Sequence, residues 1–175
     1  MRQRSGRPTP AATPAPWTLE VTLPGDLQIR MRRAFAAPRA KVFAAWTRAE
    51  HVSRWWDPAG KPLAVCEIDL RPGGAFRWVN DVPDRTQVFA GTYVEIVPPE
   101  RLVFRMPPTP AGEGALSTVL FVDHGDTTEL VVTIACRSPE QREMLLAMRV
   151  PEGTARTLDN LERHLAAGSP AEGPP

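Results

Sequence analysis

The order of hydrophobic and polar residues in the first third of the chain predicts a strand and then a helix. Leu27–Phe35 is predicted to be the strand. After it, Val42, Phe43 and Trp46 fall on one face at helical spacing, which indicates an amphipathic helix. Pro38 suits the first turn of this helix, because the N–H that a proline lacks would have no partner inside the helix there.

A second short helix is predicted directly after the first. Thr47 and Glu50 have the spacing of a capping box, in which the threonine hydroxyl accepts from the N–H of Glu50 and the carboxylate reaches back. Asp57-Pro58 should end this helix, because the proline ring disfavours a helical backbone at the preceding residue. The apolar side of the helix consists of Val52, Trp55 and Trp56.

The middle of the chain is predicted to form a sheet. Short segments with β-like composition are separated by turn signals such as Arg71–Gly74, where proline and glycine suit a tight turn. Because the connections are short, we expect antiparallel neighbours. The predicted strands are Lys61–Leu70, Ala75–Val79, Gln87–Val97, Arg101–Met106, Thr118–Asp123 and Glu129–Ala135.

Two more helices are predicted towards the C-terminal end. Ser138 and Gln141 have capping-box spacing and open a short helix, which Pro151 interrupts. On one side of that short helix lie Met144, Leu145 and Met148. A final helix then extends to about Ala166, with Gly168 as its stop. Its apolar stripe consists of Leu158, Leu161 and Leu165.

This order of elements predicts an α+β fold. A strand, two helices, a series of strands and a last helix with one apolar stripe are expected when a twisted antiparallel sheet folds around that helix. At 175 residues, the chain fits one domain. We place this domain at residues 25–167. A tail rich in proline and arginine at 1–24 and a short tail at 168–175 are expected to be disordered.

Composition and charge argue against several classes of protein. A hydrophobic content of 42%, a charged content of 23% and a formal net charge of +1 are typical of a soluble globular protein. They favour neither nucleic acid nor a membrane surface as a partner. The sequence has no apolar run that could span a bilayer and no secretion signal, and Cys66 and Cys136 lack metal-ligand spacing. We therefore expect a reduced, cytoplasmic setting.

The residue types that hydrolases and metal enzymes use are not grouped in this sequence. His51, His124 and His164 fall on separate predicted elements and outside any metal-binding motif. We interpret all three as structural or surface residues, with His51 on the exposed face of its helix. Gly73-Gly74 belongs to a hairpin turn, where glycine supplies turn geometry. The sequence thus predicts no catalytic residue, no metal and no cofactor.

Aromatic residues and methionines are the stronger candidates for a binding site. They could line a pocket for an apolar or aromatic small molecule, or they could fill a core, which is the interpretation we favour for Phe43 and Trp46. Trp55 and Trp56 cannot both point along one narrow helical stripe, so at least one is expected at a pocket rim or an interface. The candidate ligand-binding residues are Trp46, Trp55, Trp56, Phe76, Trp78, Tyr93, Phe104, Arg105, Met106, Met144 and Met148.

Polar residues inside the predicted strands give a second clue to function. Glu67, Arg77, Tyr93, Glu95 and Arg105 have apolar neighbours, and most of them are expected to face solvent. A Tyr93 or Arg105 side chain that points inward could orient a carbonyl or phenolate group of a ligand. A cyclase-like or dehydratase-like activity would then become possible.

Four segments of the chain resemble one known family. They read RAFAAPRAKVFAAWTRAEHVSRWWDPAG, CEIDLRPGG, GTYVEIVPPERLVFR and EGTARTLDNLERHL. Over Gln28–Ala166 the chain is similar to the SRPBCC (START-like, helix-grip) superfamily, within it to the branch named for the activator of heat-shock-protein-90 ATPase. The chain departs from the usual pattern at Gly153-Thr154, where a tryptophan usually follows the glycine. It also departs in the loop ACRSPEQ, which lacks the usual aromatic residue.

The resemblance implies a particular version of the α+β fold. A curved antiparallel sheet is expected to wrap around a long C-terminal helix, as in START and Bet v-like domains. Two short helices after the first strand should cap a cavity between the sheet and that helix. The run Arg33–Pro58, which contains Trp55-Trp56, is expected to form the first part of this lid.

Three hypotheses about function follow. The first is a soluble binding protein for a hydrophobic or aromatic small molecule, held between the sheet and the C-terminal helix. The second is a cyclase-like or dehydratase-like enzyme that acts on a polyketide-like or aromatic ligand in the same cavity. The third is a chaperone partner, as the name of the branch suggests. We rank it last, because the eukaryotic activators carry an additional N-terminal domain and only about two dozen residues precede this fold. Self-association as a homodimer stays open.

Overall fold

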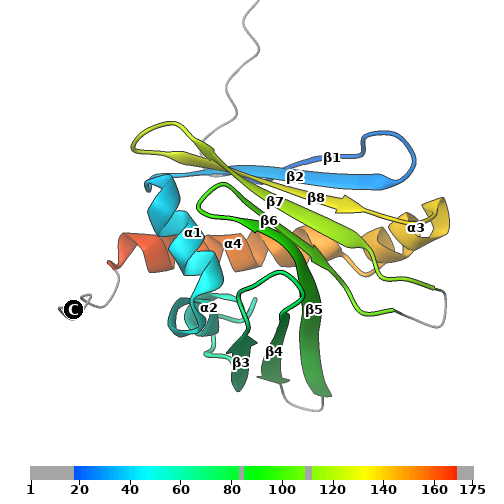
Figure 1. The fold of residues 1–175 in the computed structure, drawn as a ribbon, viewed down its shortest axis with the longest axis horizontal. Coiled ribbons are helices and arrows are strands. Elements are labelled where there is room, and N and C mark those ends of the chain that lie inside the picture. The colour runs from blue at the N-terminus through cyan, green and yellow to red at the C-terminus, as the bar shows by residue number, and fades with distance from the viewer. Residues whose placement is uncertain (1–17, 83–84, 109–111, 169–175) are drawn as a thin grey trace, which may run out of the picture.

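Eight antiparallel strands form one curved sheet that wraps around a long C-terminal helix (Figure 1). A computed structural model describes residues 18–82, 85–108 and 112–168 of the chain. The strands are β1 (Glu20–Thr22), β2 (Gln28–Phe35), β3 (Val65–Ile68), β4 (Ala75–Val82), β5 (Arg85–Val97), β6 (Arg101–Arg105), β7 (Leu116–Asp123) and β8 (Thr128–Ala135). This architecture confirms the predicted α+β helix-grip fold.

The strand order brings the beginning of the domain next to its end. The strands follow one another as β1-β2-β8-β7-β6-β5-β4-β3, and β2 pairs with β8 from Gln28 opposite Ala135 to Phe35 opposite Thr128. Residues 20–22 fall within the predicted N-terminal tail, yet they form β1 on the outer edge of β2. Three residues are too short to show a strand's alternation in the sequence. The rest of the predicted tails, at 1–17 and 169–175, lies outside the described residues.

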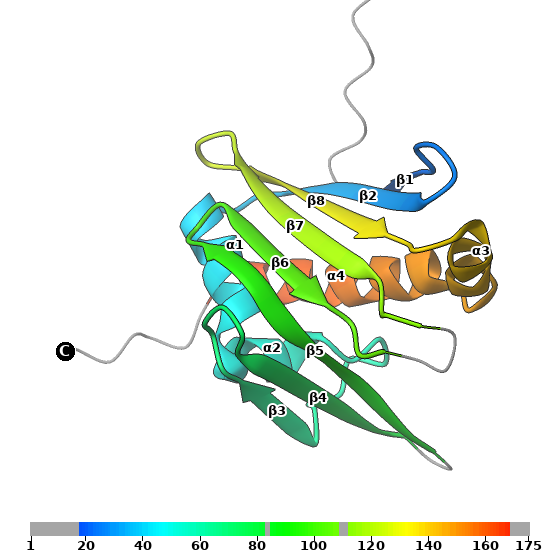
Figure 2. The ribbon, with the colours of Figure 1, turned by 45° about the vertical axis from the view of Figure 1, so that its right-hand side comes forward.

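Four helices accompany the sheet. They are α1 (Arg39–Thr47), α2 (Ala49–Trp55), α3 (Pro139–Ala147) and α4 (Val150–Ala166). Helix α4 lies along the concave face of the sheet, α1 and α2 cover one end of that face, and α3 lies at the other end (Figure 2). Within the described ranges, no helix is both long and apolar enough to cross a membrane.

The junction between α1 and α2 differs from the predicted capping box. The hydroxyl of Thr47 donates to the Phe43 carbonyl at 2.9 Å, inside α1, and so it does not cap α2. Threonine in a last helical turn often bonds back in this way. The chain turns at Arg48, which is extended (φ −99°, ψ 129°) and precedes α2 without a side-chain cap. Pro38 likewise stands just before α1, one position earlier than predicted.

The C-terminal helices follow the prediction more closely. Ser138 Oγ accepts from the N–H of Gln141 at 3.2 Å, which confirms this helix start, although the Gln141 side chain accepts from Arg137 and not from Ser138. Arg149 adopts a left-handed backbone conformation (φ 58°), which interrupts the helical conformation between α3 and α4. Pro151 therefore lies in the first turn of α4, where its missing N–H costs nothing.

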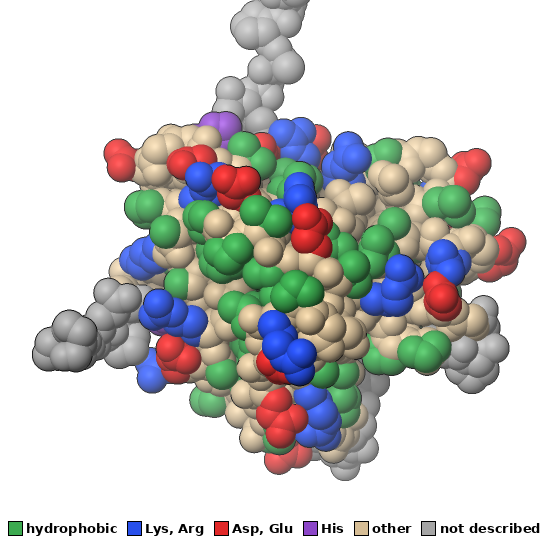
Figure 3. All heavy atoms as spheres, viewed as in Figure 1, with side chains coloured by type: hydrophobic (Ala, Val, Ile, Leu, Met, Phe, Trp, Pro, Cys, Tyr) green, Lys and Arg blue, Asp and Glu red, His purple; other side chains and the backbone are tan. Residues whose placement is uncertain are grey.

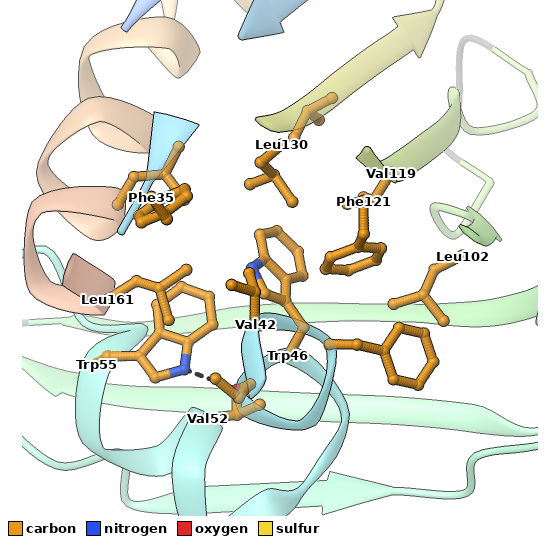
Figure 4. Close-up of a cluster of buried hydrophobic side chains, with 14 of the residues drawn as sticks. Phe35, Val42, Trp46, Val52, Trp55, Leu102, Val119, Phe121, Leu130 and Leu161 are labelled. Carbon is orange, nitrogen blue, oxygen red and sulfur yellow. Dashed lines mark hydrogen bonds between the residues drawn. The ribbon is translucent and has the colours of Figure 1, made fainter. Parts of the chain in front are cut away.

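The core lies between the concave face of the sheet and α4 (Figure 4). Helix α4 turns its predicted stripe inward, and Leu158, Leu161 and Leu165 are all buried. Helices α1 and α2 add Val42, Trp46, Val52 and Trp55 to the same core. The indole Nε1 of Trp55 donates to the Ala45 carbonyl at 2.9 Å, and this bond holds α2 against α1.

One inward position of β2 is occupied by a charged residue. Arg33 lies between the buried residues Met31 and Phe35, and only 4% of its surface is exposed. Its guanidinium donates to Asp159 Oδ1 at 2.5 Å and also to Glu162 Oε2. Both carboxylates belong to α4 and keep contact with solvent. The stem of Arg33 is thus packed in the core while its head fixes the sheet to the helix.

A pair of histidines joins α2 to α4, which corrects the predicted exposure of His51. His51 is buried, and its Nδ1 lies 2.9 Å from Nε2 of His164. The correction arises because α2 turns the face that carries His51 and Trp55 towards the core, and α4 covers it. Burial lowers the pKa of His164, and the charges of His51, Arg54 and Lys41 lower that pKa further.

We expect the two sides of the Arg33 contact to respond differently to substitution. Asp159→Asn with Glu162→Gln leaves a buried guanidinium without anions, and we expect a loss of about 3 kcal/mol in the free energy of unfolding. Arg33→Met leaves the carboxylates at the solvent edge, so its cost should be about 1 kcal/mol or less. Urea unfolding measures both losses. A larger loss in Arg33→Met than in the double variant would contradict this interpretation.

The histidine pair predicts a loss of stability in mild acid. Because the pKa of His164 is lowered in the folded protein, the unfolded chain binds the proton first as pH falls below about 6.5. The free energy of unfolding should therefore decrease with falling pH until the folded protein also takes up the proton. Urea midpoints at pH 8 and pH 5.5 test this. In His164→Gln the difference between the two midpoints should shrink, and an unchanged difference would assign the effect to other groups.

Candidate functional site

Six aromatic side chains meet on the concave face of β4, β5 and β6 and at the end of α2. We call them the inner aromatic cluster: Trp56, Phe76, Trp78, Phe89, Tyr93 and Phe104. The ring centroids of Trp56 lie 4.4 Å from Trp78 and 4.8 Å from Phe89. Those of Phe76 and Phe104 are 5.3 Å apart. The structure thus brings most of the predicted aromatic candidates together and adds Phe89, which the sequence analysis missed.

Strand pairing explains why these rings share one face. Trp78 pairs with Phe89 across β4 and β5, and residues directly opposite each other point to the same side of a sheet. Gly91 lies opposite Phe76, where a Cβ atom would stand 2.6 Å from Cζ of the Phe76 ring. Only glycine leaves room for that ring. Phe89 and Tyr93 occupy alternate positions of β5, and this period of two is the signal that could have identified Phe89.

Trp46, Trp55 and Trp56 form a second group of rings that adjoins the cluster. Trp46 is buried, as favoured for it from the sequence, and its ring centroid is 5.3 Å from Trp55 and 5.9 Å from Trp56. Of the adjacent pair, Trp55 is fully buried in the core, whereas Trp56 is half-buried. Trp56 and Phe89, which is also half-buried, therefore form the partly exposed edge of the inner aromatic cluster.

Ionisable groups next to the cluster stay protonated at neutral pH. Burial raises the pKa of the Tyr93 hydroxyl above its usual value, and the neighbouring Cys66 thiol raises it further. Burial also raises the pKa of Cys66 to about 11, with a contribution from the charge of Glu50. A protonated thiol is a poor nucleophile. The described part of the chain holds no group of three or more His, Cys, Asp or Glu side chains placed to bind a metal ion.

Two predicted site residues at the end of β6, Arg105 and Met106, lie on opposite sides of the sheet. Met106 follows Phe104 on the concave side and packs against the core. Arg105 points to the other side of the sheet, where its Nη1 lies 3.6 Å from Glu113 Oε2 and 3.4 Å from the Gly114 carbonyl. Strand alternation therefore keeps Arg105 away from the inner aromatic cluster. Glu67, Arg77 and Glu95 also face outward, as expected for most polar strand residues.

The two methionines of the α3 region lie away from the cluster. Met144 is 46% exposed and Met148 is 68% exposed. Helix α3 packs Leu145 and Leu146 against the core, which turns the methionine side towards solvent. The sequence placed Met144, Leu145 and Met148 on one side of this helix. All five residues from Met144 to Met148 are apolar, which leaves the buried face ambiguous.

An open groove at the other end of the molecule was not foreseen from the sequence. It has a volume of about 520 Å³ and is lined by Leu19, Val21, Leu146, Pro151, Glu152 and Ala155. These residues come from β1 with the residue before it, and from the corner between α3 and α4. Leu19 and Val21 fall in the predicted tail, so the sequence analysis did not consider one wall of the groove.

The outer face of the sheet mixes hydrophobic and charged side chains (Figure 3). Val88 and Val94 of β5 are 54% and 49% exposed on this face. Arg101 and Glu95 pair beside them at 2.6 Å, and Arg32 and Glu129 pair at the same distance on β2 and β8. The homodimer suggested from the sequence stays a prediction.

Several solved structures of other proteins are similar to this chain in fold. The solved structure of a protein from Rhodobacter sphaeroides has a TM-score of 0.77 to this chain and is 26% identical in sequence. That match covers 86% of this chain and 99% of the other. A protein from Nitrosomonas europaea has a TM-score of 0.74 and 24% identity, and the match covers 83% of this chain and 97% of that one.

A third solved structure, CalU16 from Micromonospora echinospora, is more distant. It has a TM-score of 0.58 and 23% identity, with 84% of this chain and 83% of that chain covered. No curated protein matches the sequence. The model of the family described as Activator of Hsp90 ATPase homolog 1-like protein matches residues 36–166. Because that match spans most of the folded domain and agrees with the resemblance found in the sequence, the chain belongs to the Activator of Hsp90 ATPase homolog 1-like family.

Proposed function

We propose that this domain binds a hydrophobic or aromatic small molecule at the inner aromatic cluster. The observation that carries the proposal is the position of six aromatic rings on the concave face, with the half-buried Trp56 at their edge. Binding sites for small molecules are lined mostly by hydrophobic and aromatic side chains. The family and the fold are compatible with such a role.

The rings contact one another in this structure, so a ligand needs one of them to move. Trp56 is the natural candidate because its backbone is held independently of its ring. The N–H of Trp56 donates to the Val52 carbonyl at 3.1 Å, and the carbonyl of Asp57 accepts from Asn160 Nδ2 at 2.6 Å. Rotation of the Trp56 side chain would therefore open the cluster without unfolding α2.

A second candidate function is catalysis on a ligand held at the same cluster, of the cyclase or dehydratase type. Tyr93 favours it, because its ring lies in the cluster and its buried hydroxyl stays protonated, able to donate to a carbonyl oxygen. Tyr93→Phe keeps the ring and removes this donor. Lost turnover with unchanged ligand affinity would support catalysis, whereas unchanged turnover of every accepted substrate would exclude this role of Tyr93.

Ligand binding can be tested by tryptophan fluorescence and thermal unfolding with a panel of flavonoids, polyketide-like aromatics, fatty acids and sterols. A ligand at a hundred times its Kd stabilises a protein by about 2.7 kcal/mol, which should raise the melting temperature by roughly 5–10 °C. We expect saturable quenching together with this rise for at least one aromatic compound.

Two aspartate variants of β5 serve as a matched pair. Phe89→Asp places a charge in the inner aromatic cluster and should abolish the response, because burying an unpaired carboxylate against a ligand is unfavourable. Val88→Asp places the same charge on the outer face and should leave the response intact. An equal response in both variants, or none from any compound, would contradict the proposal. In the second case a protein partner becomes the better hypothesis.

A further inference from the structure

Two indole N–H groups at the inner aromatic cluster are buried without a hydrogen-bond acceptor. Among the described residues, four buried side-chain atoms lack a partner, and all four are N–H donors: Arg33 Nε, Trp46 Nε1, Trp78 Nε1 and Arg142 Nε. Two of the four belong to indole rings at the cluster. Trp55 provides the contrast, since its buried Nε1 donates to the Ala45 carbonyl at 2.9 Å.

Both unpaired indoles contact the ring of Trp56. The centroid distance from Trp56 is 4.4 Å to Trp78 and 5.9 Å to Trp46. Phe89 also lies against Trp56, at 4.8 Å, and stacks on Trp78 at an interplanar angle of 29°. Removal of the Trp56 ring from its present position would leave a space walled by flat aromatic surfaces. Two of the rings in that wall, Trp46 and Trp78, carry a buried N–H group without an acceptor.

We infer that the ligand is a planar aromatic molecule with a hydrogen-bond acceptor, and that it takes the place of the Trp56 side chain. This inference rests on the proposed function. The aromatic walls favour a flat ring system. A carbonyl or ether oxygen of the ligand accepts from Trp78 Nε1, which gives that buried N–H the partner it lacks. A ligand without an acceptor leaves the N–H unpaired.

Fluorene and 9-fluorenone are a matched pair of probes for this inference. They share a planar three-ring skeleton and differ by a methylene group in one and a carbonyl group in the other. Water solvates the carbonyl better, so a site that recognises only apolar surface favours fluorene. A hydrogen bond from a buried indole should instead favour fluorenone by roughly three- to tenfold in Kd. Isothermal titration calorimetry with the full chain measures both constants.

Indole resonances identify the tryptophan that makes the bond. In ¹H–¹⁵N spectra of the labelled full chain, fluorenone should shift the Trp78 indole N–H downfield more than fluorene does. Both probes should change the Trp56 resonance, because its ring moves. The Trp55 resonance is an internal control: its N–H is already bonded to Ala45, so the movement of the Trp56 ring 5.4 Å away should shift it similarly with both probes, without the extra downfield shift of fluorenone. These wild-type spectra test the inference even where a tryptophan variant is poorly stable.

Two phenylalanine variants complete the test. Trp78→Phe keeps a ring and removes the N–H, so it should still bind fluorene and should lose the preference for fluorenone. Trp46→Phe removes the other unpaired N–H and should keep the preference. If fluorene binds and fluorenone is not preferred, or if the preference survives in Trp78→Phe, the inference is overturned while the proposed function stands. If neither probe binds although a compound of the panel does, the inference alone is overturned. If no compound of the panel binds either, the proposed function is overturned as well.

Discussion

The position of α4 depends on polar contacts that separate elements make with one short stretch of it. Arg33 of β2, Asp57 after α2 and His51 of α2 each bind a side chain within residues 159–164. Hydrophobic packing is not directional, so the leucine stripe alone would let the helix slide or rotate on the concave sheet. These contacts fix the C-terminal half of α4, whereas the N-terminal half borders the open groove.

One of these contacts also holds the backbone next to Trp56 in place. Asn160 of α4 holds the carbonyl of Asp57, and Asn80 of β4 donates to the Asp57 carboxylate at 3.4 Å. The backbone after Trp56 is therefore tied to both the helix and the sheet. The side-chain rotation that we infer for Trp56 would leave these backbone contacts in place, because they involve Asp57 and not the indole ring.

Sequence patterns predicted the sheet, the helices and most aromatic residues of the cluster, because strand alternation assigns large side chains such as Phe76 and Trp78 to one face. Strand alternation alone also assigns Arg33 to the inner face, because it lies between Met31 and Phe35. Its charge, however, would lead one to expect a side chain that faces solvent. Its partners on α4 lie 126 and 129 residues later, and only folding brings them together. His51 was misplaced for the same reason, since its partner is distant in sequence.

The buried indoles of this domain differ in whether their N–H group has an acceptor. Trp55 and Trp78 are both buried, yet only Trp55 has an acceptor for its N–H. An unpaired buried donor costs about 1–3 kcal/mol of stability. Phenylalanine at position 78 would keep an aromatic ring in the cluster without that cost. The chain thus carries an unpaired indole N–H at Trp78, next to the ring of Trp56, and the inferred ligand would supply the acceptor that this N–H lacks.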